Sequence, residues 1–229
     1  FKVVKPTQVT NKRWVMGYEG KAKGTKVVVK NGAEIVPSLV TQMPKKDSLQ
    51  IWMKPVKADS LQVMVEKDNF KTDFYIKGKS NKVDSLQINP EFTGGLPLRE
   101  RYTLNSTTPL VKFDKTKISI KNKDSLAIDF TTVYDDFNQK LYLDFKKEPL
   151  ENYKIQLLPG AVVDFFDTAN DTLNYKASTK NLSDYGNLRV VLENVKRFPV
   201  IIELTDKDGK VKYTEYSEGN NTINFDAIE

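Results

Sequence analysis

Apolar residues recur at every second position along most of the chain. Leu61, Val63 and Val65 form one such run, and Leu141, Leu143 and Phe145 form another. Alternation over four to eight residues places one face of a strand on a core and the other in water, as in antiparallel sheets. No segment of ten or more residues carries an apolar stripe of helical period. The pattern therefore predicts an all-β chain of tandem antiparallel β-sandwich modules.

Turn residues separate these runs and indicate where modules begin and end. Asn31-Gly32 stands between two β-branched runs, which predicts a hairpin, and residues 206–209 and 218–221 predict two more turns. Residues 104–109 and 181–186 are small and polar, as linkers are. We therefore expect a first Ig-like sandwich over residues 1–104, a second module over 105–181 and a third over 182–229.

Composition excludes several classes of chemistry. The 229 residues include no cysteine and no histidine, so disulfides, thiol nucleophiles, the Ser-His-Asp triad and imidazole metal ligands are absent. The net charge of +6 comes from dispersed lysines, as in residues 112–123, with acidic residues between most of them. Such lysines are typical of solvated strand faces, and we expect no nucleic-acid partner. We also expect no enzymatic activity, no catalytic residue and no cofactor.

The middle module carries a family resemblance. A Tyr-led strand at Tyr153 is followed by Gly160-Ala161, by Asp164 and by a closing strand from Tyr175 that ends in Thr179. This order resembles the SbsA-type bacterial Ig-like domain over about 75 residues. The usual Asp-x-x-Gly turn of that family is replaced by Asp-Phe-Phe-Asp at residues 164–167, which puts the geometry of this loop in doubt.

The last module looks like the start of a prealbumin-like or Cna-B-like module, truncated before its closing strand. Its first strand is led by Gly186, Pro199 opens the second, and Asp208-Gly209 forms the turn before the third. Together the modules resemble the large Ig-like lipoproteins displayed on the outer membrane of Bacteroidota. The resemblance implies a non-catalytic structural and interaction protein of the cell surface, or an accessory subunit of an envelope complex. Its partners would be proteins of the cell envelope.

The resemblance also implies how the protein would be attached to the membrane. The sequence contains no apolar run long enough to span a bilayer and no targeting segment at Phe1. We therefore expect this chain to be a piece of a longer, extracytoplasmic protein, held at the outer membrane by a lipid anchor outside this piece.

One short motif is repeated. Asp-Ser-Leu occurs four times, and two Asp-Thr-apolar relatives follow, where composition predicts roughly one such triplet. One interpretation is turn chemistry, since Asp and Ser side chains hydrogen-bond to nearby backbone where strands begin. The other is similarity to the acceptor motif for O-glycosylation in Bacteroidota. The hydroxyl groups concerned belong to Ser48, Ser60, Ser85, Ser125, Thr168 and Thr172.

Two further sets of residues give alternatives. Trp14, Tyr18 and Trp52 could form a sugar-stacking platform, because Trp52 alternates oppositely to its apolar neighbours and is expected on an outer face. This predicts, as the alternative function, a carbohydrate-binding accessory module. Asp164, Asp167 and Asp171 could supply oxygen ligands to a hard cation, and this possibility stays open, so no metal site is assigned.

A glycosidase-like pair of carboxylates is the remaining catalytic candidate. Asp135 and Asp136 precede Glu148 and Glu151 by about a dozen residues, and such a pair must lie roughly 5–10 Å apart across a cleft. Nothing in the sequence predicts that cleft. We therefore expect these acidic residues to lie in solvated loops.

Overall fold

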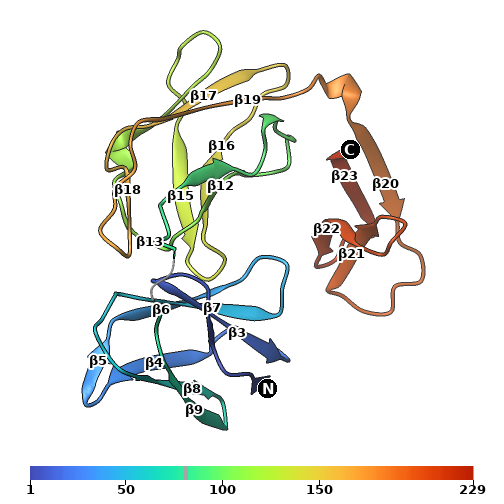
Figure 1. The fold of residues 1–229 in the computed structure, drawn as a ribbon. Coiled ribbons are helices and arrows are strands. Elements are labelled where there is room, and N and C mark those ends of the chain that lie inside the picture. The colour runs from blue at the N-terminus through green and yellow to red at the C-terminus, as the bar shows by residue number, and fades with distance from the viewer. Residues whose placement is uncertain (80–81, 229) are drawn as a thin grey trace.

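The computed structural model describes residues 1–79 and 82–228, and it is nearly all β (Figure 1). Within these ranges the only helical segments are two short 3-10 turns, Lys115–Lys117 and Leu182–Asp184. Among the described residues, no helix is long and apolar enough to cross a membrane. The predicted fold class, antiparallel β-sandwich modules, is confirmed.

The first sandwich comprises residues 1–79. Its strands are β1 (Lys2–Val3), β2 (Thr7–Gln8), β3 (Arg13–Glu19), β4 (Lys26–Asn31), β5 (Glu34–Val36), β6 (Ser38–Gln42), β7 (Ser48–Met53), β8 (Leu61–Lys67) and β9 (Phe70–Ile76). One sheet has the order β1-β3-β7-β6 with β2 also paired to β3, and the other has the order β5-β4-β8-β9. Inward residues such as Met16, Leu49 and Val63 are fully buried between the sheets, because alternation gives each strand one apolar face.

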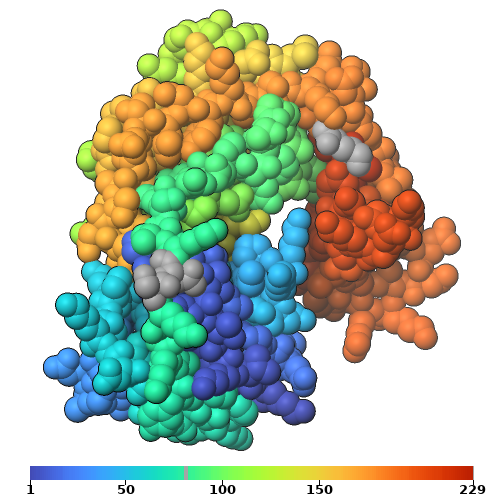
Figure 2. Space-filling model, in the orientation of Figure 1, coloured from blue at the N-terminus to red at the C-terminus, as the bar shows by residue number. Residues whose placement is uncertain are grey.

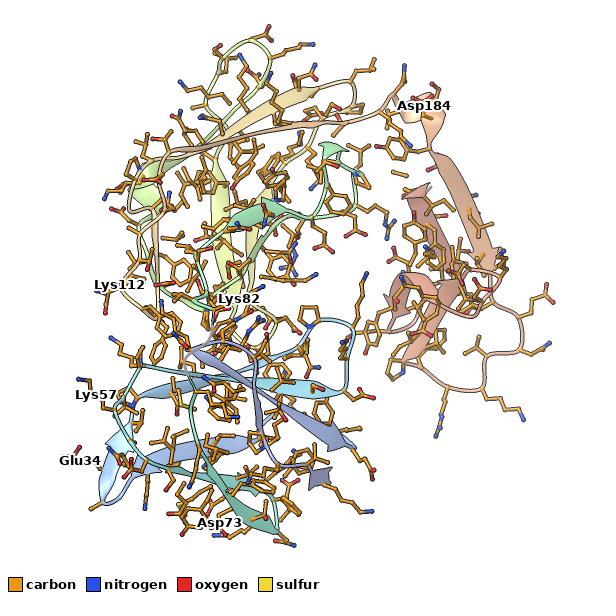
Figure 3. All side chains as sticks on the ribbon, viewed as in Figure 1. Glu34, Lys57, Asp73, Lys82, Lys112 and Asp184 are labelled. Carbon is orange, nitrogen blue, oxygen red and sulfur yellow. The ribbon has the colours of Figure 1, made fainter. Side chains whose placement is uncertain are left out.

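Local chemistry explains the edges of this module. β4 and β5 are joined by the predicted hairpin, in which Gly32 has a φ of 61°, a conformation that glycine adopts without steric cost. Charged side chains such as those of Glu34, Lys57 and Asp73 point away from the sandwich (Figure 3). The core and its solvated surface therefore follow the alternation read from the sequence.

The second sandwich comprises residues 82–180. Its strands are β10 (Ile88–Pro90), β11 (Gly94–Gly95), β12 (Tyr102–Ser106), β13 (Leu110–Phe113), β14 (Ile118–Lys121), β15 (Phe130–Asp135), β16 (Lys140–Phe145), β17 (Asn152–Leu157), β18 (Val162–Asp164) and β19 (Leu173–Ser178). Sheets of order β10-β12-β16-β15 and β11-β19-β17-β14 enclose one core, and β13 pairs with β18. Every pairing is antiparallel except that of β11 with β19.

The third module comprises residues 181–228 and has two ribbons of two strands each. β20 (Gly186–Val191) pairs with β23 (Thr222–Ile228), and β21 (Val200–Thr205) pairs with β22 (Val211–Ser217). The turn predicted at residues 206–209 joins β21 to β22, and the Asp206 carboxylate accepts the Asp208 and Lys210 N–H groups at 3.0 Å. Its buried apolar residues are few, namely Tyr185, Ile223 and Phe225.

The structure places the first module boundary earlier than residue 104. That residue lies inside β12, where Leu104 pairs with Leu141 and is fully buried in the second core. The polar segment that follows resembles a linker in composition, but Thr108 is buried and donates a hydrogen bond to Asp164 at 2.8 Å. The chain crosses between the sandwiches after Ile76 and before Ile88. Residue 182 begins the 3-10 turn between β19 and β20.

Candidate functional site at the junction of the two sandwiches

Trp52 is the centre of the contact between the first and second sandwiches. It lies on β7 between Ile51 and Met53, whose side chains enter the first core, so its own side chain emerges on the outer face of the sheet. Trp52 is nevertheless fully buried. Its ring lies 6.3 Å from that of Phe166 in the second sandwich, and the Arg13 guanidinium lies 5.2 Å from its centroid. The sheet face predicted to be outer is therefore covered by the neighbouring module.

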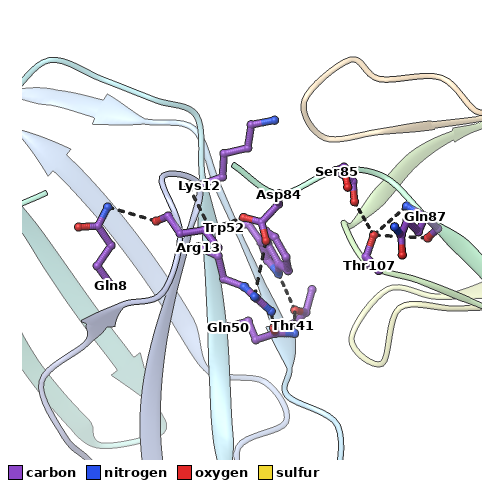
Figure 4. A network of polar contacts seen from close by, with 11 residues as sticks. Gln8, Lys12, Arg13, Thr41, Gln50, Trp52, Asp84, Ser85, Gln87 and Thr107 are labelled. Atoms are coloured by element: carbon purple, nitrogen blue, oxygen red, sulfur yellow. Dashed lines mark hydrogen bonds and ion pairs between the residues drawn. The ribbon is translucent and has the colours of Figure 1, made fainter. Parts of the chain in front are cut away.

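A polar network surrounds the indole ring on this face (Figure 4). The Trp52 Nε1–H donates to Thr41 Oγ1 at 2.8 Å, and Gln50 donates to the same oxygen at 3.3 Å. Arg13 donates to Gln50 Oε1 at 2.9 Å. Buried polar groups are costly unless paired, so these bonds allow Thr41 and Gln50 to lie beneath the second sandwich without an unpaired side-chain amide or hydroxyl.

The chain that crosses between the sandwiches is bound to both of them. Asp84 forms an ion pair with Arg13 at 3.5 Å and accepts a hydrogen bond from the Thr10 hydroxyl, so it is held on the first sandwich. The backbone carbonyl of the next residue, Ser85, accepts a hydrogen bond of 2.7 Å from the Thr107 hydroxyl of the second sandwich. Adjacent linker residues thus bind different modules, and this arrangement restricts rotation between them.

The loop after β18, residues 165–167, supplies the second sandwich's main contact, and we call it the docking loop. Lys12 of the first sandwich lies 4.2 Å from the centroid of the Phe166 ring, and Lys54 forms an ion pair with Asp167 at 2.9 Å. Asp164 holds the loop from beneath, since its Oδ1 accepts the N–H groups of Phe166 and Thr168 at 2.9 and 2.8 Å. The Asp-Phe-Phe-Asp sequence of residues 164–167 therefore lies at the module contact.

A second segment of the second sandwich also reaches the first. The turn between β15 and β16 brings the Phe137 carbonyl to the Gln42 N–H at the end of β6, at 2.6 Å. The Phe137 ring packs against the first core. The two sandwiches therefore meet along a continuous strip that runs from the Asp84 linker across Trp52 to the edge of β6.

The third module meets the second sandwich through a smaller contact. Arg99 donates to the Asp226 carbonyl at 2.8 Å, forms an ion pair with Glu215 and lies 5.7 Å from the centroid of the Tyr213 ring. The Arg99 and Glu215 side chains keep 29% and 30% of their exposure, so water screens the pair. In Figure 2 the third module forms a separate lobe beside the two sandwiches, and an opening shows through where the three modules adjoin.

The six acceptor residues of the repeated triplets differ in accessibility. Ser85, Ser125, Thr168 and Thr172 are exposed, whereas Ser48 and Ser60 are half-buried at the starts of β7 and β8. In the described ranges, none of the six hydroxyl groups makes a side-chain hydrogen bond. The turn interpretation requires the serine and threonine side chains to hydrogen-bond to the local backbone, and these six side chains do not. Ser85 and Thr168 lie along one hollow of about 660 Å³ beside the junction.

The sugar-stacking platform predicted from three aromatic residues is wrong. Trp14 is 5% exposed in the first core and Trp52 is fully buried at the junction. Tyr18 is half-buried and donates to Gln42 Oε1 at 3.1 Å. The sequence placed Trp52 on the correct face of β7 but contained no signal that another module covers that face.

The acidic residues considered as cation ligands or as a glycosidase pair are either far apart or already engaged in hydrogen bonds and ion pairs. Asp164 is 1% exposed and uses both carboxylate oxygens on hydrogen bonds, and Asp167 pairs with Lys54. Across residues 1–79 and 82–228, no group of three or more acidic residues is arranged to hold a metal ion. Asp135 and Glu148 flank opposite ends of β16, which are roughly 16 Å apart at 3.3 Å per residue. That separation exceeds what a glycosidase pair requires.

Comparison with known proteins assigns neither a family nor a function to the chain. A scan against protein-family models found no match to the chain, and a search of curated proteins found no relative. The function of the chain must therefore be inferred from the junction and from the module surfaces.

Proposed function

We propose that the chain is a non-catalytic structural and interaction segment of a bacterial cell-surface protein, in which the first two sandwiches act as one rigid body. The observation that carries this proposal is the complete burial of Trp52 on the outer face of its own module. Fully burying an aromatic side chain stabilises a contact by about 1.5–3 kcal/mol. Because a short linker already holds the modules together, that energy is enough to favour the docked state strongly.

The surrounding contacts support a fixed orientation rather than a flexible tether. A linker whose adjacent residues, Asp84 and Ser85, bind different modules leaves little freedom between them. The docking loop is itself held by Asp164. A rigid pair of sandwiches suits a spacer that presents partner-binding surfaces at a fixed distance from the membrane, and its partners would be other proteins of the cell envelope.

The proposed location rests on the resemblance and on the triplets. The arrangement of the modules resembles that of the large Ig-like lipoproteins of the outer membrane, and this resemblance supports the proposed location. Exposed hydroxyls at Ser85, Ser125, Thr168 and Thr172 are accessible to a glycosyltransferase. We include O-glycosylation of these residues, and attachment through a lipid anchor elsewhere in the protein, in the proposal.

Two measurements on the protein from its native host test this proposal. Peptide mapping should find added hexose-type mass on the four exposed acceptors and less on Ser48 and Ser60. Protease treatment of intact cells should release fragments of this chain, and release only after lysis would contradict a surface location. Unmodified peptides at all six positions would contradict the glycosylation.

A further inference from the structure

Three lysines form a row across the outer face of one sheet of the second sandwich. Lys121 of β14 is paired with Lys154 of β17, and Lys154 is paired with Lys176 of β19. We call these three residues the lysine row. They come from segments more than 20 residues apart, and β17 and β19 lie side by side in Figure 1. Only the register of the sheet brings them together.

The lysine row has no acidic partner among the described residues. Its ammonium groups form no ion pair, and the other outward residues of the three strands are uncharged: Ser119, Asn152, Gln156, Asn174 and Ser178. Glu151, just before β17, accepts the backbone N–H groups of Lys123 and Asn152. These hydrogen bonds hold the pKa of Glu151 below its ordinary value. Glu151 therefore stays ionised beside the face, while the lysine row supplies the only charged groups among the outward residues of β14, β17 and β19.

Like charges directly opposite each other on neighbouring strands destabilise a sheet, because their Cβ atoms lie only about 4.5–5.5 Å apart. Single lysines are common on a solvated strand face, but three in line repel one another, and neutral polar residues would avoid that repulsion. An anionic ligand would relieve the repulsion. The arrangement therefore points to binding at this face.

The face is also hollowed where the lysines stand. One hollow of about 380 Å³ is lined by the lysine row together with Ser119, Gln156, Asn174 and the proposed acceptor Ser125. A second, of about 280 Å³, adjoins it and shares Lys154 and Lys176. Gln156 and Asn174 both line the first hollow, and a hydrogen bond of 2.9 Å between them orients their amide groups.

We propose that the lysine row and the adjoining amides bind an acidic polysaccharide. The ammonium groups would pair with successive carboxylates, and the Gln156 and Asn174 amides would bind the hydroxyl groups between them. β17 and β19 have backbone partners on both sides, and residues 127–128 bond to the outer side of β14, so a peptide could not readily add to this sheet as a strand. The outward residues of the three strands include no aromatic ring on which the bases of a single-stranded nucleic acid could stack.

Titration calorimetry with the whole chain and an octamer of galacturonic acid tests this inference, in buffer of about 50 mM ionic strength. The uronate octamer should bind, and a neutral octamer of glucose should not. The triple variant Lys121→Gln, Lys154→Gln, Lys176→Gln should bind roughly tenfold or more weakly. A matched variant, Lys26→Gln, Lys46→Gln, Lys57→Gln, loses the same charge from the first sandwich and should bind as the wild type does.

Several outcomes would overturn the inference. An equal loss of affinity for the uronate octamer in both triple variants would mean that binding depends only on the net charge of the chain. Binding of a poly-glutamate peptide or of pyrophosphate without binding of the uronate octamer would indicate an acidic protein or a small anion instead. The lysine-row variant should also melt roughly 1–3 °C higher than the wild type, since repulsion is removed. This site is independent of the junction, so its failure would leave the rigid-body proposal intact.

Discussion

The indole ring of Trp52 and the phenyl ring of Phe166 lie 6.3 Å apart, centroid to centroid, although they belong to different sandwiches. The contact turns the outer face of the β7 sheet into the interior of a larger unit. Removing one ring should therefore affect both modules at once.

Phe166→Ala should lower the free energy of unfolding by about 1–2 kcal/mol, less than for a core phenylalanine because Phe166 is only half-buried. Urea titration followed by far-UV circular dichroism, which reports on the strands of both sandwiches, measures this loss. The wild type should unfold in a single transition, and the variant should unfold in two. Val133→Ala is a control, because Val133 is 51% exposed on β15. An unchanged single transition in Phe166→Ala would mean that the ring does not couple the modules.

Asp164 should matter to the junction although it does not touch the first sandwich. Its side chain accepts two backbone N–H groups of residues 166 and 168 and the Thr108 hydroxyl. Asp164→Ala should destabilise the second sandwich by about 2–3 kcal/mol, since buried donors lose their acceptor. Calorimetric melting measures this effect. Asp171→Ala, at an exposed position seven residues later, should change the melting temperature little, and an equal effect would contradict the role given to Asp164.

The third module should be held less firmly than the first two are held to each other. Arg99→Ala removes the guanidinium that binds Glu215 and the Asp226 carbonyl, so small-angle X-ray scattering should show a larger radius of gyration. About 1 M NaCl should shift the wild type in the same direction, because salt screens exposed ion pairs. Arg101→Ala is a control, since Arg101 stacks on Tyr142 within the second sandwich. Scattering unchanged in Arg99→Ala would contradict this contact.

Alkaline pH should destabilise the second sandwich through buried tyrosines. Burial raises the pKa of the Tyr175 hydroxyl to about 12 from the ordinary value of 10.0, and its Oη donates to the Ile88 carbonyl at 2.7 Å. Between these values the folded protein keeps a proton that the unfolded chain loses, so stability is complete below pH 10 and falls as pH rises toward 12. Burial raises the pKa of Tyr102 as well.

Urea midpoints at about pH 9 and pH 11 measure this loss. Tyr175→Phe should be less stable than the wild type at the lower pH, because the hydrogen bond is lost, but its stability should decline less between the two values. An equal decline in both proteins would contradict the assignment to Tyr175.

The local features of the fold could be predicted because they depend on neighbouring residues. Period-two alternation identified the strands around Val63 and Leu143, and Asn31-Gly32 identified a hairpin. The boundary at residue 104 could not be predicted correctly, since a buried polar segment bonded to Asp164 has the composition of a linker. Its burial depends on β16 and β18, which lie dozens of residues away.

The junction and the lysine row could not be predicted from the sequence, for a related reason. Trp52 was expected on an outer face, and only the docking loop of another module covers it. Lys121, Lys154 and Lys176 look like scattered solvated lysines until strand register aligns them. Both features arise from pairing between distant segments, which no local pattern encodes.

The distance between the two sandwiches tests the rigid junction most directly. The chain has no native cysteine, so spin labels at Lys26→Cys on β4 and Thr131→Cys on β15 can be measured by double electron–electron resonance. The wild-type background should give one narrow distance distribution, and adding Phe166→Ala should broaden it. A broad distribution in the wild-type background would contradict a rigid pair of sandwiches.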